Sequence, residues 1–258
     1  MLQGATLERV GIDAVALKPA EVDVERAVDL DVDMLAVDYE GREHLPSPET
    51  LADLAAEADV RVTTPVRADG FDPLGDDSLV SVLPERVRRV LVAGHPAYLT
   101  DTEQERAVAP RLSEAADQCR DPWVGTEGVE RIALAVGGTQ FELLGPGTDR
   151  RLRALRQAGY DGEVVVYAPT VLTDEEDNVL DALGAYAARR GPVAAALPDG
   201  APTDAAAGGR AREVLSQAVR DYGLVGGVDD VSERVDELKS AGADRIVGYP
   251  ARGLDPIL

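Results

Sequence analysis

Short apolar runs alternate with longer amphipathic stretches along almost the whole chain of 258 residues. The apolar runs are rich in Val, Ile, Leu and Ala and lack polar alternation, which is typical of strands buried on both faces. Eight such runs occur, at residues 14–17, 34–37, 60–64, 89–93, 132–136, 164–167, 223–226 and 245–248. This repeated order of strand and helix indicates an α/β fold with a parallel sheet.

The stretches between the runs have the spacing of amphipathic helices. They lie near residues 20–30, 49–58, 75–86, 101–118, 148–158, 174–190, 204–220 and 229–241. Eight strands and about eight helices in this order predict a (β/α)8 TIM-like barrel, shortened or irregular, that forms a single domain over residues 1–258. Small and polar residues between 201 and 209 predict a mobile insertion near 198–210.

The number of strands leaves a second fold open. Residues 140–144 have the composition of another short strand, and residues 192–197 fit either a strand or the end of a helix. With these segments added, an open doubly wound sheet is the alternative to the barrel.

The last β-α-β unit is the most clearly defined part of the pattern. Asp230 and Glu233 have the spacing of a capping box at the start of a helix, and apolar residues at helical spacing follow until Gly242. The apolar run at 245–248 then resumes at strand spacing. A unit of this kind at the end of an α/β chain closes a barrel or completes a parallel sheet.

The charge balance limits the partners that the protein can bind. The chain has 48 acidic and 26 basic residues, and its net charge of -22 repels nucleic-acid backbones and anionic membranes. We therefore expect a small-molecule ligand, with no nucleic-acid or membrane partner; a homo-oligomer is compatible with the sequence. The acidic residues are spread over all the predicted helices, which we interpret as a halophilic surface adaptation.

Two further features suggest where the protein is found. Cys119 is the only cysteine, so an intrachain disulfide is excluded. The longest apolar runs are short strands, and no basic segment followed by an apolar one begins the chain. We therefore expect a cytoplasmic protein.

Candidate catalytic residues follow the predicted strands, because the active site of a barrel is built from the loops after the carboxyl ends of its strands. His95 follows the fourth strand and could donate to a ligand or relay a proton near neutral pH. Asp38 ends the second strand, where it could position a substrate or cofactor. Each also has a structural interpretation, since His95 can bond to loop backbone and Asp38 can cap a turn.

Glycines at strand ends suggest where phosphate groups would bind. The pairs at 137–138 and 226–227 let backbone amides approach an anion, and the second pair precedes a helix; tight turns explain both pairs equally well. The predicted cofactor contacts are Tyr39, Thr64, Gly94, Gly137, Gly138, Gly226 and Gly227. We predict no metal site, because the two histidines, His44 and His95, lie in different loops.

The end of the chain resembles a known family. Residues 225–235 and 241–247 are similar to the closing segment of luciferase-like monooxygenases and their deazaflavin-dependent relatives. Residues 248–256 are similar to the end of methylenetetrahydromethanopterin reductases, which use coenzyme F420. Residues 27–39 resemble the family's second helix and strand, where Asp38 matches an Asp-His pair and Tyr39 stands where histidine is expected.

This resemblance implies a barrel that binds FMN or coenzyme F420 and transfers a hydride, with the protein supplying orientation and electrostatics. It also implies that His95 and Asp38 face the reacting ring. The chain departs from the family in its shorter length and in residues 94–96, Gly-His-Pro, which replace a glycine-rich turn.

These departures leave two other functions open. One is a barrel that has lost catalysis and acts as a binding or assembly module; a mouth plugged by Tyr39, Tyr98 or Pro96 would favour it, and an open polar cleft would favour the enzyme. The other is a lyase or aldolase that uses Lys18, at the end of the first strand, as its Schiff-base residue.

Overall fold

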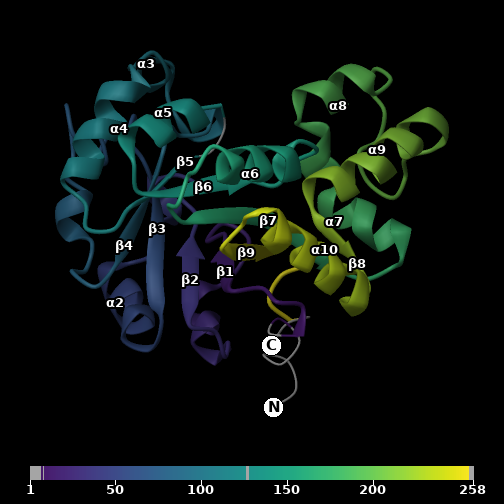
Figure 1. Cartoon of the computed structure of the whole chain (residues 1–258), viewed down its shortest axis with the longest axis horizontal. Helices are drawn as coiled ribbons and strands as arrows, with labels where there is room; N and C mark the ends of the chain where they lie inside the picture. The colour runs from purple at the N-terminus through teal and green to yellow at the C-terminus, as the bar shows by residue number, and fades with distance from the viewer. Residues whose placement is uncertain (1–6, 8, 126–127, 256–258) are drawn as a thin grey trace.

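The computed structural model describes Leu7, residues 9–125 and residues 128–255. Within these residues, eight parallel strands close into a barrel in which β9 pairs with both β7 and β1 (Figure 1). They are β1 (Ala14–Leu17), β2 (Met34–Val37), β3 (Asp59–Pro65), β4 (Arg88–Val92), β5 (Trp123–Gly125), β6 (Thr139–Leu143), β7 (Val164–Leu172) and β9 (Arg245–Pro250). The predicted (β/α)8 barrel is confirmed, and the open doubly wound sheet is wrong.

A further strand lies outside this ring. β8 (Leu224–Gly226) pairs with the last three residues of β7, beyond the part of β7 that pairs with β6. The predicted strand at 223–226 therefore exists, but β9 is the strand that completes the barrel wall.

Helices cover the outside of the barrel. The α-helices are α2 (Pro48–Glu57), α3 (Asp101–Gln104), α4 (Val108–Asp117), α5 (Glu130–Val136), α6 (Thr148–Gln157), α7 (Glu176–Ala188), α8 (Gly191–Ala196), α9 (Gly209–Tyr222) and α10 (Val228–Ala241). The 3-10 turns are η1 (Val24–Asp29), η2 (Arg42–His44), η3 (Val80–Val82) and η4 (Pro96–Tyr98). Figure 1 shows α7, α8 and α9 grouped at one side of the barrel, where they share their own apolar cluster.

The fifth predicted strand is wrong. Residues 132–136 belong to α5, and the barrel position is taken by β5, which pairs with β4 on one side and β6 on the other. Ile132 and Val136 are apolar because they pack against α4 and the outer face of the sheet, and Ala133 is buried there. The optional strand at 140–144 is present as β6, whereas residues 192–197 fall in and just after the helix α8.

Three predicted helices differ in length or type. The segment at 20–30 contains the 3-10 turn η1, and only η3 is helical within 75–86. In that second segment Asp76 folds the chain back, because its carboxylate accepts from the Ser78 N–H and its carbonyl accepts from the Gly70 N–H. Residues 101–118 form two helices, α3 and α4, instead of one.

The predicted insertion near 198–210 connects α8 to α9. It packs against α7, because the Ala205 N–H donates to Asp181 Oδ1 at 2.9 Å and Ala207 is buried. Its mobility stays a prediction.

The interior of the barrel is filled by small side chains on one side and large ones on the other. Strands β1 and β2 contribute three alanines and one methionine, Ala14, Ala16, Ala36 and Met34, and strands β5, β6, β7 and β9 contribute the aromatic side chains Trp123, Phe141, Tyr167 and Tyr249. This division lets the aromatic rings extend across the barrel axis without overfilling it.

A stacked arginine and tryptophan fill the barrel near the amino ends of its strands. The Trp123 side chain is fully buried; its ring stacks on that of Phe141, with centroids 5.6 Å apart, and lies 4.4 Å from the Arg61 guanidinium carbon. Arg61 is held in turn by Asp121, through its carbonyl and its carboxylate. The barrel is therefore blocked at this end.

Candidate functional site

A cavity of about 230 Å³ opens at the carboxyl ends of the barrel strands. Its wall comes from six of the strands or the residues just after them, from the η4 turn and from the end of α7. The lining residues are Lys18, Asp38, Tyr39, Glu40, Thr63, Pro65, Val92, Gly94, His95, Ala97, Tyr98, Leu99, Phe141, Leu143, Tyr167, Tyr186, Arg189 and Arg190. The cavity thus occupies the end of the barrel where sequence reasoning expected the site.

Asp38 and Tyr167 form a hydrogen-bonded pair in this cavity, and the pKa of each is raised. The Tyr167 hydroxyl donates to Asp38 Oδ2 at 2.8 Å. Burial raises the pKa of Asp38 to about 6, although the hydrogen bond from Tyr167 and the charge of Lys18 both act to lower it. Burial and the neighbouring carboxylate also raise the pKa of Tyr167 well above its usual range. Asp38 is therefore a carboxyl group that titrates close to neutral pH.

Lys18 lies over an aromatic ring beside this pair. Its Nζ is 4.2 Å from the centroid of Tyr249 and 3.4 Å from a carboxylate oxygen of Glu21. The Tyr249 hydroxyl donates to the same Glu21, and burial together with that bond raises the pKa of Tyr249. The Lys18 ammonium and the Tyr249 hydroxyl thus both already contact the Glu21 carboxylate.

His95 lies on the exposed side of the cavity and starts the η4 turn. Its Nδ1 accepts from the Ala97 N–H at 3.1 Å. Because Nδ1 accepts, the neutral imidazole carries its proton on Nε2. The structural role predicted for His95, bonding to loop backbone, is therefore present, and Nε2 is left as a donor.

The carboxylate of Glu40 connects the segment after β1 to the η4 turn in the cavity wall. It is 8% exposed, accepts from the Ala20 N–H at 2.9 Å and accepts from the Tyr98 hydroxyl at 3.5 Å. Tyr98 itself is 40% exposed, so its ring borders the mouth without filling it. The mouth is therefore open, and both polar and apolar residues line it.

Two adjacent arginines border the cavity at the end of α7. Arg189 is exposed, and its guanidinium carbon is 6.0 Å from the centroid of the Tyr186 ring. Arg190 donates to the Tyr186 hydroxyl and packs against the rings of Tyr186 and Tyr222, at 4.4 and 5.6 Å from their centroids. The helical group α7–α9 thereby adds positive charge to a cavity otherwise built by the barrel.

Four of the predicted site residues meet in this cavity: Asp38, Tyr39, Gly94 and His95. The Tyr39 N–H donates to the Thr63 hydroxyl at 2.6 Å. Gly94 has a φ of +94°, and a Cβ there would lie 2.9 Å from Pro65 Cβ, so only glycine fits comfortably between these strand ends.

Thr64 does not reach the cavity. It is fully buried on the outer face of β3, where its hydroxyl donates to the Val90 carbonyl and accepts from Arg89 Nε. Successive residues of a strand point to opposite faces, so Thr63 points into the barrel in its place. The placement expected for Thr64 is wrong by one residue.

The pair Gly137 and Gly138 lies at the other end of the barrel. These glycines connect α5 to the start of β6 and so precede a strand instead of following one. Tyr160 donates to the Gly138 carbonyl there. The prediction failed because residues 132–136 are a helix, which reverses the direction in which the loop faces.

Gly226 ends β8 and Gly227 follows it, outside the barrel ring. The Gly227 N–H already donates to Asp174 Oδ1 at 2.7 Å and to Asp230 Oδ2 at 3.1 Å. Two carboxylates therefore occupy the helix N-terminus at which we expected a phosphate, and they would repel an anion.

Sequence reasoning missed Thr63, Tyr167 and the arginine pair as parts of this site. Tyr167 ends the sixth predicted strand, so the strand-end argument that selected Asp38 applies to it as well. For Arg189 and Arg190, the only sequence signal is that they are adjacent at the end of a helix in an acidic chain.

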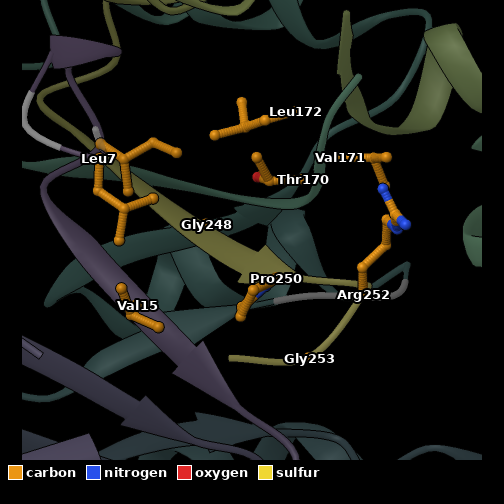
Figure 2. Close-up of a pocket in the computed structure, with 10 residues that line it drawn as sticks. Leu7, Val15, Thr170, Val171, Leu172, Gly248, Pro250, Arg252 and Gly253 are labelled. Atoms are coloured by element: carbon orange, nitrogen blue, oxygen red, sulfur yellow. The ribbon is translucent and has the colours of Figure 1, made fainter. Parts of the chain in front are cut away.

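A second cavity lies outside the barrel wall, between β1, β9 and the end of β7 (Figure 2). Figure 2 shows Val15, Gly248 and Pro250 on one side of it and Thr170 and Leu172 on the other. Its volume of about 30 Å³ has room for only one or two water molecules, so it is too small for a substrate.

Among the described residues, no group of three or more His, Cys, Asp or Glu side chains is arranged to hold a metal ion. In the same part of the chain, no helix is both long and apolar enough to cross a membrane.

Comparisons with known proteins agree with this architecture. The sequence model of a family of unknown function, DUF7388, matches residues 7–257. No functionally curated protein matches the sequence. The structure is similar to that of an F420-dependent secondary alcohol dehydrogenase in complex with an F420-acetone adduct, with a TM-score of 0.62 and 12% identity over 95% of this chain and 96% of that chain. At this identity the similarity shows a shared barrel fold.

Proposed function

We propose that this chain, which belongs to the family of unknown function DUF7388, is an oxidoreductase that binds FMN or coenzyme F420 in the mouth of its barrel and transfers a hydride. The observation that carries the proposal is the open cavity at the carboxyl ends of the strands, where an aromatic wall faces a carboxyl group with a pKa of about 6. The similar dehydrogenase, whose complex contains an F420-acetone adduct, supports the choice of cofactor.

The cavity fits the ring of such a cofactor better than the whole molecule. Its volume of about 230 Å³ is below the roughly 300–1,000 Å³ of pockets that enclose a drug-sized ligand. Phe141, Leu143 and Tyr167 would hold the planar ring, while a flexible chain would extend over the rim. When bound, either cofactor supplies the hydride chemistry that protein side chains lack.

Asp38 is the residue best suited to move a proton in this cavity. With a pKa of about 6 it is mostly ionised at pH 7 and can accept a proton from a substrate hydroxyl, whereas below pH 6 it can donate one. The bond from Tyr167 fixes the carboxylate, so one oxygen is aligned while the other is left for the ligand.

His95 supplies a donor on the opposite, exposed side. Its Nε2–H is the free end of an imidazole whose Nδ1 is fixed by the η4 backbone. A donor so placed can bind a carbonyl or phosphoryl oxygen of a ligand at the mouth.

The same cavity argues against the two other functions. A binding or assembly module would have a filled mouth, whereas Tyr39 and Tyr98 border an open cavity that also holds Asp38, Glu40 and His95. A Schiff-base role for Lys18 would require it to give up both its ion pair with Glu21 and its contact with the Tyr249 ring.

The test is titration of the purified protein with FMN and with coenzyme F420, followed by absorbance and by the fluorescence of Trp123, the only tryptophan in the chain. Trp123 stacks on Phe141 in the cavity wall, so a ring bound there is expected to quench it. Asp38→Asn should retain binding and lose reduction or oxidation of the cofactor by substrate, and Asp53→Asn, on the exposed face of α2, should retain both. The proposal fails if neither cofactor changes absorbance, fluorescence or thermal stability.

A further inference from the structure

We infer that Arg189 and Arg190 form an anion-recognition site at the rim of the cavity, which binds a phosphate or carboxylate group of the ligand. The inference rests on the proposed function only in taking the cavity as the place where ligands bind. It adds the residues that would bind an anionic group of the ligand.

The rim of the cavity carries positive charge in a chain that is acidic overall. The chain carries 48 acidic and 26 basic residues, yet two adjacent arginines border its barrel-mouth cavity. In a protein with a net charge of -22, an anion is repelled over most of the surface and needs a local positive field to approach. Paired guanidinium groups at a cavity rim provide such a field.

Among the described residues, Arg189 has no hydrogen-bond or ion-pair partner. Its guanidinium contacts the ring of Tyr186. By contrast, Arg234 pairs with Asp149 and Arg212 with Asp177. Arg189 therefore keeps its full set of donors for a ligand.

Aromatic rings, and not a carboxylate, hold the Arg190 side chain in place. Its guanidinium lies between the Tyr186 and Tyr222 rings and donates to the Tyr186 hydroxyl, and its buried Nε has no hydrogen-bond partner. A guanidinium fixed in this way loses little conformational entropy when it binds an anion, and its fork of donors matches carboxylate and phosphate oxygens.

Among the described residues, neither carboxylate that lines the cavity, Asp38 or Glu40, forms an ion pair with these arginines. Asp38 accepts from Tyr167, and Glu40 accepts from the Ala20 N–H and from Tyr98. Arg189 lies close enough to Tyr98 for its charge to oppose the rise in the pKa of that hydroxyl, which burial and Glu40 cause. Arg189 and the η4 turn therefore border the same mouth.

The position of the pair after α7 has a second physical consequence. Cations at a helix C-terminus interact favourably with the helix dipole, which accounts for a positive residue there. It does not account for two successive arginines that both border the cavity, one unpaired and one fixed by rings.

The experiment measures anion binding in the absence of cofactor, so it stands apart from the test of the proposed function. Inorganic phosphate and succinate are titrated by calorimetry at constant ionic strength. Arg189→Gln is expected to weaken both by about tenfold, the effect of losing one charge-assisted contact. The matched control is Arg120→Gln, an exposed arginine near the amino end of β5 that changes the net charge equally and should leave both affinities unchanged.

A second variant distinguishes weaker anion binding from a general loss of folding. Arg190→Lys keeps the charge but loses the planar fork, so it should bind phosphate more weakly than wild type while unfolding with the same cooperativity. Equal phosphate and succinate binding by wild type, Arg189→Gln and Arg120→Gln would overturn the inference.

A comparison of FMN with riboflavin, which lacks the phosphate, identifies the source of the anion. If Arg189→Gln weakens FMN but not riboflavin, the site binds the cofactor phosphate. If it weakens succinate but leaves both flavins unchanged, the site binds a separate anionic substrate. Loss of phosphate binding in a protein that binds no flavin or F420 would leave the anion site supported and the proposed oxidoreductase wrong.

Discussion

The hydroxyl of Tyr167 on β7 donates a 2.8 Å hydrogen bond to Asp38 after β2, two strands that are not neighbours in the barrel. The bond therefore crosses the mouth of the barrel instead of following its wall. Burial still raises the pKa of Asp38 to about 6, because the loss of hydration outweighs this bond and the charge of Lys18.

Asp38→Asn is expected to stabilise the folded protein at neutral pH. The folded-state pKa of about 6 lies above the ordinary value of 3.8, so the folded state binds more protons than the unfolded state between these values. The stability cost of ionising Asp38 is thus absent below the lower pKa and fully present above the higher one. Asparagine avoids that cost and keeps an oxygen to accept from Tyr167.

The gain should be on the order of 3 kcal/mol at pH 7.5 and close to zero at pH 4, measured by urea unfolding. Asp53→Asn on the surface of α2 serves as the control and should change little at either pH. A loss of stability at pH 7.5 in Asp38→Asn would contradict the raised pKa.

Tyr167→Phe is expected to raise the pKa of Asp38 further above about 6. The hydroxyl stabilises the carboxylate by donating to it, and phenylalanine removes that donor while retaining the ring. The variant should also lose about 1 kcal/mol of stability above pH 6.

The Asp38 carboxyl can be titrated directly by carbon-13 NMR. The control is Tyr160→Phe, whose hydroxyl donates to the Gly138 carbonyl near the amino end of β6. An unchanged or lowered pKa of Asp38 in Tyr167→Phe would show that the bond does not stabilise the carboxylate.

Trp123→Ala is expected to destabilise the protein by about 3–5 kcal/mol, because it empties the fully buried space between Arg61 and Phe141. Trp123→Phe should cost less, since it keeps an aromatic face toward both neighbours. Urea unfolding is followed by circular dichroism, because these variants lack tryptophan fluorescence. Equal costs for the two variants would mean that the stacked aromatic contact contributes nothing.

Gly184→Ala is expected to destabilise the protein even though alanine favours helices by about 1 kcal/mol over glycine. Gly184 lies within α7, and a Cβ there would be 2.1 Å from the Thr203 carbonyl oxygen of the segment that crosses it. The expected cost is about 1–3 kcal/mol, the usual range for overpacking.

Gly191→Ala provides the matched control at the start of α8. No atom lies within 4 Å of the position its Cβ would take, so thermal unfolding should show no loss of stability. A Gly184→Ala protein as stable as Gly191→Ala would mean that the segment around Thr203 yields at no cost.

The alternation of apolar runs was sufficient to predict the barrel, because buried parallel strands have a composition that helices on the surface do not share. It failed at β5, whose three residues are too few to show any period. The apolar residues of 132–136 resembled the missing strand, but they are apolar because the helix α5 packs on α4.

Only the site residues that directly follow the carboxyl end of a strand could be predicted from the sequence. Asp38 and His95 directly follow strands, and both line the cavity. Thr63 was missed for Thr64 because the direction of a strand side chain depends on which residue starts the inward series, and in β3 the polar Arg61 and Thr63 face inward while Val60 and Val62 face outward. Arg189 and Arg190 come from a helix whose position depends on tertiary packing.

The stack of Arg61 on Trp123 closes the barrel at the amino ends of its strands, so ligands enter the cavity from the carboxyl ends. Two molecules that react in such a cavity must enter one after the other, and the first to enter is the last to leave. For the cofactor and substrate of the proposed oxidoreductase, we expect this shared entrance to produce an ordered rather than a random mechanism in steady-state kinetics.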